Sequence, residues 1–191
     1  MDTLTHYLAG YFIGRRGGAD TDLLRATTLC AVLPDLDFIG ALWGWDAMAD
    51  LHRTLTHSLL GMFIIVLLVV AAMAYYRGKD AAMYALPFCF MSGISHLLLD
   101  MFCFPKSLLY VFGVPGAPAG PAYLEGIPLA WPLTDHRFSV VNQGILWLEI
   151  VGWVMIVMFC LSIVYIIRRY RKGDLVWEIW TIPIKERLQR E

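Results

Sequence analysis

The feature that most constrains the fold is an uninterrupted apolar run at residues 58–76. It contains nineteen residues and no charged side chain. An α-helix rises about 1.5 Å per residue, so about twenty residues cross a hydrocarbon core of about 30 Å. The run therefore predicts a membrane-spanning helix and argues against an ordinary soluble domain.

The composition of the whole chain agrees with a membrane as its solvent. Apolar residues make up 59% of the 191 residues and charged residues only 16%, whereas an average soluble domain has about 25% charged residues. The 15 lysines and arginines nearly balance the 16 aspartates and glutamates, so the chain lacks the net positive charge that attracts nucleic acid. We expect membrane lipid, and not nucleic acid, as a partner.

Three further segments are long and apolar enough to cross a membrane: residues 23–45, 81–104 and 144–167. The last of them is interrupted only by Glu149, whereas the other two carry histidine, arginine or aspartate side chains. Residues 4–13 are too short to cross alone and predict a short helix that lies in or partly enters the bilayer. We therefore predict an all-α fold, an integral membrane helical bundle of about four spanning helices plus a short N-terminal helix.

Basic residues in the short connections predict the orientation of the bundle. They form three groups that can lie on the cytoplasmic side together: Arg15, Arg16 and Arg25; Arg77 and Lys79; and Arg168, Arg169, Arg171 and Lys172. This arrangement puts the C-terminus in the cytoplasm and residues 44–57 and 105–143 on the opposite, periplasmic side. The N-terminus has no early Lys or Arg, which argues against a cleaved signal peptide.

Two regions are expected along the chain. Residues 1–172 form the membrane-embedded domain, and residues 173–191 form a cytoplasmic amphipathic tail that carries Trp177 and Trp180 beside charged residues.

Ionisable residues in a membrane span cost several kcal/mol unless they face protein, water or a metal. In this chain, four of the five histidines and three aspartates lie in or beside the predicted spans: His6, Asp35, Asp37, His52, His57, His96 and Asp100. Neutral imidazole and carboxylate are ligands that suit zinc, manganese or iron. The set predicts a site for one to three divalent ions, with Zn²⁺ favoured and Mn²⁺ or Fe²⁺ as alternatives.

Sequence spacing brings several of these residues together. His96 and Asp100 are four residues apart, which puts both side chains on one face of a helix. His52 and His57 bracket the entry to the span at residues 58–76. Arg53 lies between them and offers a fork of donors to a phosphate.

Asp35 and Asp37 follow Pro34, which removes a backbone donor and favours a break in the helix. A divalent cation would offset the repulsion between the two carboxylates, although Asp37 can instead orient a histidine. The predicted topology puts this pair and His6 deeper in the membrane than His57. The cluster therefore closes only if the first two helices are displaced or tilted.

Four stretches of the sequence resemble, in order, the motifs of the YdjM-like family: Met-Asp-Thr-Leu-Thr-His (1–6), Leu-Pro-Asp-Leu-Asp (33–37), His-Arg-Thr-Leu-Thr-His-Ser (52–58) and His-Leu-Leu-Leu-Asp (96–100). Trp131-Pro132-Leu133 resembles a shorter motif of that family, and the resemblance covers roughly residues 1–140. It implies a LexA-regulated, membrane-bound metal-dependent hydrolase of the bacterial inner membrane. It also implies a distant similarity to zinc-dependent phospholipase C, carried mainly by His96 and Asp100.

Two functions follow from these residues. The first is a membrane-bound metal-dependent hydrolase that cleaves a phosphoester in a phospholipid-like or other amphiphilic substrate at the outer face of the inner membrane. In that enzyme Asp35 or Asp37 bridges metals or accepts a proton from water, and Arg53 steadies the phosphate. The alternative is a divalent-metal transporter or sensor that uses the same ligands, although many clustered ligands suit retention better than passage.

Other residues carry simpler expectations. His136 is expected to be a surface residue of the outer loop, and Gly10 and Gly14 are expected to permit close helix packing. The cysteines are expected to be small buried hydrophobes: Cys30, Cys89, Cys103 and Cys160.

Overall fold

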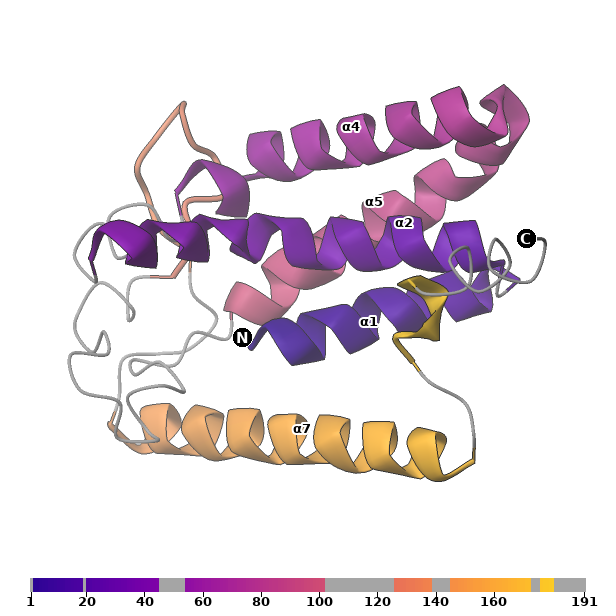
Figure 1. Ribbon diagram of the computed structural model, residues 1–191. Helices are drawn as coiled ribbons and strands as arrows, with labels where there is room; N and C mark the ends of the chain where they lie inside the picture. The colour runs from indigo at the N-terminus through magenta and orange to yellow at the C-terminus, as the bar shows by residue number, and fades with distance from the viewer. Residues whose placement is uncertain are drawn as a thin grey trace.

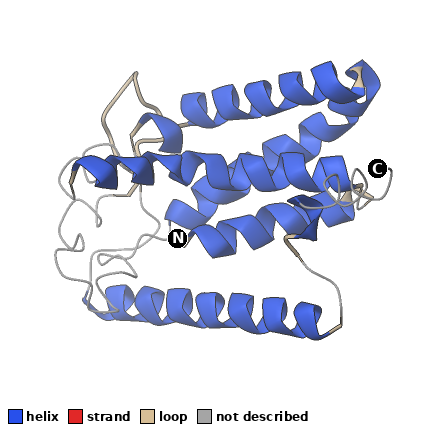
Figure 2. Ribbon diagram, in the orientation of Figure 1, coloured by secondary structure: helices blue, strands red, loops and turns tan. Residues whose placement is uncertain are grey.

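The computed structural model describes residues 2–18, 20–44, 54–101, 126–138, 145–172 and 176–180. The described helices are α1 (Thr3–Arg16), α2 (Thr21–Val32), α4 (Leu59–Arg77), α5 (Lys79–Met101) and α7 (Ile145–Arg171), with the 3-10 segments η1 (Leu33–Trp43), η2 (Leu55–His57) and η4 (Glu178–Trp180). No β-strand occurs in these ranges, which hold only an isolated antiparallel bridge between Ile127 and Phe138 (Figure 2). The prediction of an all-α membrane bundle is confirmed.

Successive helices run in opposite directions along the bundle (Figure 1). As a result, α1, α4 and α7 end where α2 and α5 begin. This end carries basic residues of all five helices and is called the basic end here: Arg15, Arg16, Arg25, Arg77, Lys79, Arg168, Arg169 and Arg171. The start of α1, the end of η1, the start of α4 and the end of α5 lie at the opposite end.

Three of the described helices are long and apolar enough to cross a membrane: Leu59–Arg77, Lys79–Met101 and Trp153–Arg171. The segment 23–45, expected as a further span, is not one continuous α-helix. The α-helix ends at Val32 and the chain continues as the 3-10 segment η1. Pro34 explains the change, because it has no N–H to donate to the carbonyl of Cys30 and so breaks the α-helical pattern.

The core lies between α2, α4 and α5. Its buried apolar side chains come from these three helices, with one from the loop after residue 126: Leu23, Ala26, Cys30, Met62, Val66, Val69, Ala85, Cys89, Leu97 and Ile127. The outward faces of α4 and α7 are largely exposed apolar side chains, as expected for helices surrounded by lipid. The core therefore holds α2, α4 and α5 together and leaves α7 at the periphery.

Close contact between α1 and α2 depends on glycine. A Cβ atom built at Gly10 would lie 2.7 Å from the carbonyl oxygen of Thr27 and 2.8 Å from the Cβ of Ala31, and one at Gly14 would collide with the hydroxyl of Thr27. The two helices can approach this closely only because both positions lack a side chain. The expectation for Gly10 and Gly14 is confirmed.

Part of the predicted tail packs on the bundle. Val176 and Ile179 are buried against α1 and α2, and Tyr7 donates a hydrogen bond of 3.0 Å to the Val176 carbonyl. Arg25 Nε donates to the Ile179 carbonyl at 2.5 Å. The described part of the tail is thus a 3-10 turn at the basic end, and residues 173–175 and 181–191 lie outside the described residues.

The cysteines only partly meet their expectation. Cys30 and Cys89 are buried, but Cys160 is exposed, so the expectation for Cys160 is wrong. It lies on α7, which buries few of its described side chains against the bundle, and a thiol facing lipid needs no polar partner. Cys103 lies outside the described residues.

Candidate metal centre

Six of the seven predicted ligands lie together at the end of the bundle opposite the basic end. They come from four elements: His6 from α1, Asp35 and Asp37 from η1, His57 from η2, and His96 and Asp100 from α5. His6, His57 and His96 have no exposed surface, and Asp35 and Asp100 are 4% and 1% exposed. His52 and Arg53 lie outside the described residues.

Helix caps fix the backbone positions of two of these residues. Asp2 caps α1 by accepting a 2.8 Å hydrogen bond from the N–H of Thr5, which places His6 in the first turns of the helix. Ser58 caps α4 through the N–H of Gly61 at 3.0 Å, directly after His57. A Cβ at Gly61 would collide with the carbonyl of Leu55, so this glycine lets η2 fold back over the start of α4.

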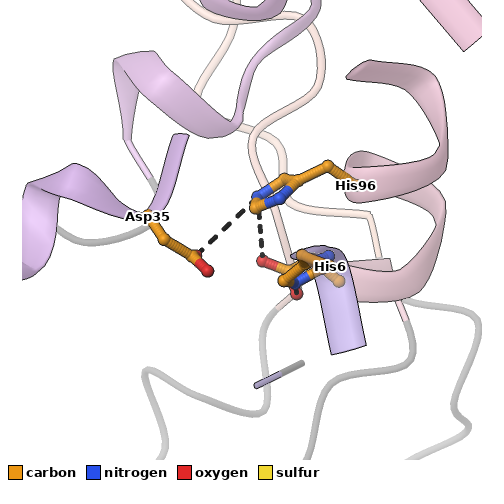
Figure 3. Close-up of side chains that lie close together, drawn as sticks. His6, Asp35 and His96 are labelled. Atoms are coloured by element: carbon orange, nitrogen blue, oxygen red, sulfur yellow. Dashed lines mark hydrogen bonds and ion pairs between the residues drawn. The ribbon is translucent and has the colours of Figure 1, made fainter. Parts of the chain in front are cut away.

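Four of the ligands form a tight group. One ligand atom from each of His6, Asp35, His96 and Asp100 lies within 4.8 Å of the other three. His6 Nε2 is 3.1 Å from Asp100 Oδ1, and His96 Nε2 is 3.7 Å from Asp100 Oδ2 and 3.9 Å from Asp35 Oδ1. Figure 3 shows His96 between Asp35 and His6, with the two imidazole rings close together.

His57 joins this group from the loop before α4. Its Nε2 is 3.0 Å from Asp100 Oδ2 and 3.6 Å from Asp35 Oδ1, while its Nδ1 is 3.3 Å from Asp37 Oδ2. Burial disfavours the charged imidazole, but the surrounding carboxylates of Asp100, Asp35 and Asp37 hold the pKa of His57 well above its ordinary value. Positive charge is therefore favoured at this point among the carboxylates.

Asp37 lies behind His57 and away from the tight group. Its Oδ2 accepts a 2.9 Å hydrogen bond from the hydroxyl of Thr56 and faces the Nδ1 of His57. A carboxylate at Nδ1 orients the ring and directs Nε2 toward the other ligands. Asp37 thus lies where it can orient His57, the alternative role predicted for it from the sequence.

His96 is oriented by the backbone. Its Nδ1 is 2.7 Å from the carbonyl oxygen of Ala31, which accepts only, so Nδ1 carries the proton and Nε2 keeps its lone pair. In 3-10 geometry the Ala31 carbonyl would accept from residue 34, but Pro34 has no N–H. The same proline that ends α2 therefore leaves a carbonyl available to His96.

The arrangement fits a divalent cation. Asp35 Oδ1, His96 Nε2 and His6 Nδ1 are buried polar atoms with no hydrogen-bond partner, and such atoms are costly unless something satisfies them. The first two are acceptors 3.9 Å apart. Ligand atoms about 2 Å from one ion lie at most roughly 4 Å apart, so the four-residue group needs only a small contraction to close on an ion.

Two supporting hydroxyls were not predicted from the sequence. Thr3 donates a 2.8 Å hydrogen bond to Asp35 Oδ2, and Thr56 donates to Asp37. Both threonines lie in the sequence stretches that contain His6 and His57. A hydroxyl close in sequence to a predicted ligand could therefore have indicated a supporting hydrogen bond. His136 is exposed, as expected, and its N–H donates to Thr134 Oγ1 at 3.1 Å.

Comparison with known proteins gives one match. A family model described as YdjM inner membrane protein matches residues 1–182. Searches among curated proteins and among solved structures each found no match. The matched region contains all the described helices and every residue of the candidate metal centre.

Proposed function

This chain belongs to the YdjM family of inner membrane proteins, and from this premise we propose that it is a membrane-bound, metal-dependent hydrolase of phosphoesters. The observation that carries the proposal is the buried convergence of His6, Asp35, His96 and Asp100 within 4.8 Å. Imidazole and carboxylate ligands of this kind suit Zn²⁺ first, and Mn²⁺ or Fe²⁺ next. When bound, such an ion supplies Lewis acidity that lowers the pKa of water and polarises a phosphoryl oxygen.

The side chains around the ligands have separable roles in this proposal. Thr3 holds Oδ2 of Asp35, so that Oδ1 faces the cluster and would hold the ion. Asp37 holds His57 in orientation from Nδ1. Arg53 is proposed to steady the phosphate as the bond from phosphorus to the leaving oxygen breaks.

An amphiphilic substrate, such as a phospholipid, is supported by the surroundings of Asp35. The same 3-10 segment exposes four large apolar side chains: Leu36, Ile39, Leu42 and Trp43. They form an apolar surface along the element that carries Asp35. A molecule with a phosphoester and an apolar tail matches a carboxylate site beside an apolar surface better than a soluble nucleotide does.

We place the metal centre on the periplasmic side. The basic end carries the Lys and Arg residues of all five helices, and such residues favour the cytoplasm. The metal centre lies at the opposite end of the bundle (Figure 1). The C-terminus then lies on the cytoplasmic side with the basic end.

A transporter or sensor with the same ligands is the competing proposal. Transport requires a polar route from the metal centre to the basic end, but the described core between them is mainly apolar side chains of α2, α4 and α5. The buried hydroxyls of Thr27 and Thr28 already donate to backbone carbonyls of α2. The buried Ser92 is already bonded to the carbonyl of Thr27. This packing supports retention of an ion over its passage.

The two proposals are distinguished in one reconstituted sample. Purified protein in phospholipid vesicles with Zn²⁺ is expected to release a water-soluble phosphoester product, and Asp35→Asn is expected to lower the rate by at least about a hundredfold. His136→Ala is the matched control, because this histidine is exposed and does not belong to the cluster. Zinc flux into the vesicles without phosphoester turnover would contradict the hydrolase and support the transporter.

A further inference from the structure

A groove between α1 and α7 takes no part in the proposed hydrolysis. Its volume is about 510 Å³, and it is lined mainly by apolar side chains, from Thr5 to Phe12 on α1 and from Met158 to Arg168 on α7. Ten helical residues rise about 15 Å, which is about half of the 30 Å hydrocarbon core. The groove therefore has the length of the apolar part of one bilayer leaflet.

The basic end of this groove is surrounded by arginines. Phe12 and Tyr165, whose ring centroids are 5.0 Å apart, line both the groove and an adjoining cavity of about 500 Å³. Arg15 and Arg16 line that cavity, and Arg168 lines the groove itself. In the part of the chain that the structure describes, none of these arginines forms an ion pair with a carboxylate.

The groove is separate from the metal centre. Thr5 and Leu99 line its far end, next in sequence to His6 and Asp100, but these two ligands are buried on the inner side of the bundle. The Thr5 hydroxyl is already bonded to Asp2 at 2.7 Å. A molecule in the groove would therefore contact α1 and α7 without reaching the ligands.

We propose that this groove binds one anionic phospholipid, with its phosphate on Arg15, Arg16 and Arg168 and an acyl chain between α1 and α7. Guanidinium groups pair with phosphate oxygens in bidentate geometry, and basic pockets between membrane helices at the cytoplasmic side suit anionic headgroups. The apolar walls suit a chain and exclude a free anion. The bound lipid joins α7, which contributes little to the core, to the rest of the bundle.

The test compares lipids that differ only in headgroup. Detergent-purified protein is mixed with equal amounts of phosphatidylglycerol and phosphatidylcholine with the same acyl chains, and the retained lipid is counted by native mass spectrometry. We expect one phosphatidylglycerol to be retained and to raise the melting temperature. Soluble glycerol phosphate, which has no acyl chain, is expected to leave the melting temperature unchanged.

Two variants examine the two halves of the site. Replacing the three arginines (Arg15→Gln, Arg16→Gln, Arg168→Gln) should lower the preference for phosphatidylglycerol by at least tenfold, since each basic residue contributes roughly fivefold. Ala9→Phe fills the groove without changing charge and should abolish retention, and it keeps the test decisive if the triple variant does not fold. The control (Lys79→Gln, Arg171→Gln, Lys172→Gln) removes equal charge from exposed residues of the same end and should keep the lipid.

Three results would overturn the proposal. One is equal retention of the two lipids by the wild type. Another is an equal loss of phosphatidylglycerol in the control variant, which would assign the effect to general surface charge. The third is stabilisation by glycerol phosphate as strong as that by the lipid, which would make the arginines a simple anion site.

Discussion

At the scale of single residues, the two carboxylate oxygens of Asp35 have different surroundings. Oδ2 accepts a hydrogen bond from Thr3, whereas Oδ1 has no hydrogen-bond partner and faces His57 and His96. A hydroxyl that fixes one oxygen directs the other toward a cation. Thr3 therefore acts on the site through Asp35, although it does not itself reach the cluster.

Thr3→Val removes this hydrogen bond and keeps the shape of the side chain. We expect metal affinity to fall by about tenfold, the effect typical of losing a group that orients a ligand. Thr3→Ser keeps the hydroxyl and should restore the affinity. Competition with a metal indicator dye measures both variants, and equal affinities for Thr3→Val and the wild type would show that Thr3 does not position Asp35.

Asp35 and Asp37 are expected to differ when each is changed to asparagine. Asp35 belongs to the four-residue group, so Asp35→Asn should lower both metal content and turnover. Asp37 contacts the outer nitrogen of His57, so Asp37→Asn should keep most of the metal and lower turnover by roughly tenfold or more. Metal content and vesicle turnover are measured on the same preparations, and loss of metal from Asp37→Asn alone would reverse the two roles.

Residue types and spacing were enough to select side chains that converge in the structure, but not to identify their other partners. His96 and Asp100 share a helix face at a spacing of four residues, and a histidine or aspartate in a span is costly without a partner. The carbonyl of Ala31 could not be predicted from the sequence as the partner of His96, because a backbone acceptor has no residue type to identify it. That contact depends on how closely α2 and α5 pack.

At the scale of elements, the contact between α1 and α2 controls whether His6 reaches the cluster. The sequence placed His6 at a different depth from His57 unless the first helices were displaced. In the structure, the first turns of α1 lie beside the end of α5, and His6 Nε2 is 3.1 Å from Asp100. The glycine contact with Thr27 and Ala31 makes this position possible.

Gly10→Ala tests that contact. The added Cβ would meet the backbone of Thr27 and Thr28 at 2.7–2.9 Å, so α1 must move outward. Overpacking of this kind costs about 1–3 kcal/mol, which corresponds to a melting temperature lower by roughly 3–10 °C, and metal retention should fall with it. Ala9→Ser adds one atom on the groove side of the same helix and should change neither the melting temperature nor metal retention. Equal losses of metal in Gly10→Ala and Ala9→Ser would show that the close contact at Gly10 does not position His6.

Hydropathy favoured a span at residues 23–45 but could not indicate the helix type, which changes after Val32. An α-helix and a 3-10 helix of the same composition have the same hydropathy, and they differ in which carbonyl each N–H reaches. Pro34 indicated a break, yet a break can appear as a kink or as a change of helix type. The sequence alone does not distinguish these outcomes, because they also depend on how the segment after Pro34 packs on its neighbours α4 and η2.

At the scale of the whole molecule, alternation of the helices separates the basic end from the metal centre. Single-cysteine labelling tests the orientation proposed from that separation. Asp135→Cys, on the side of the metal centre, should react with a membrane-impermeant maleimide in intact cells, whereas Lys172→Cys should react only after permeabilisation. The parent for both variants has all four native cysteines replaced: Cys30, Cys89, Cys103 and Cys160. The reverse pattern of labelling would place the metal centre in the cytoplasm.

The proposed function depends most directly on a metal ion bound at the buried cluster, and elemental analysis of detergent-purified protein measures that ion. We predict at least one equivalent of a divalent metal in the wild type, a loss of most of it in His96→Ala, and full retention in His136→Ala. Wild-type protein without stoichiometric divalent metal, or His96→Ala with unchanged metal content, would contradict a metal centre at this cluster.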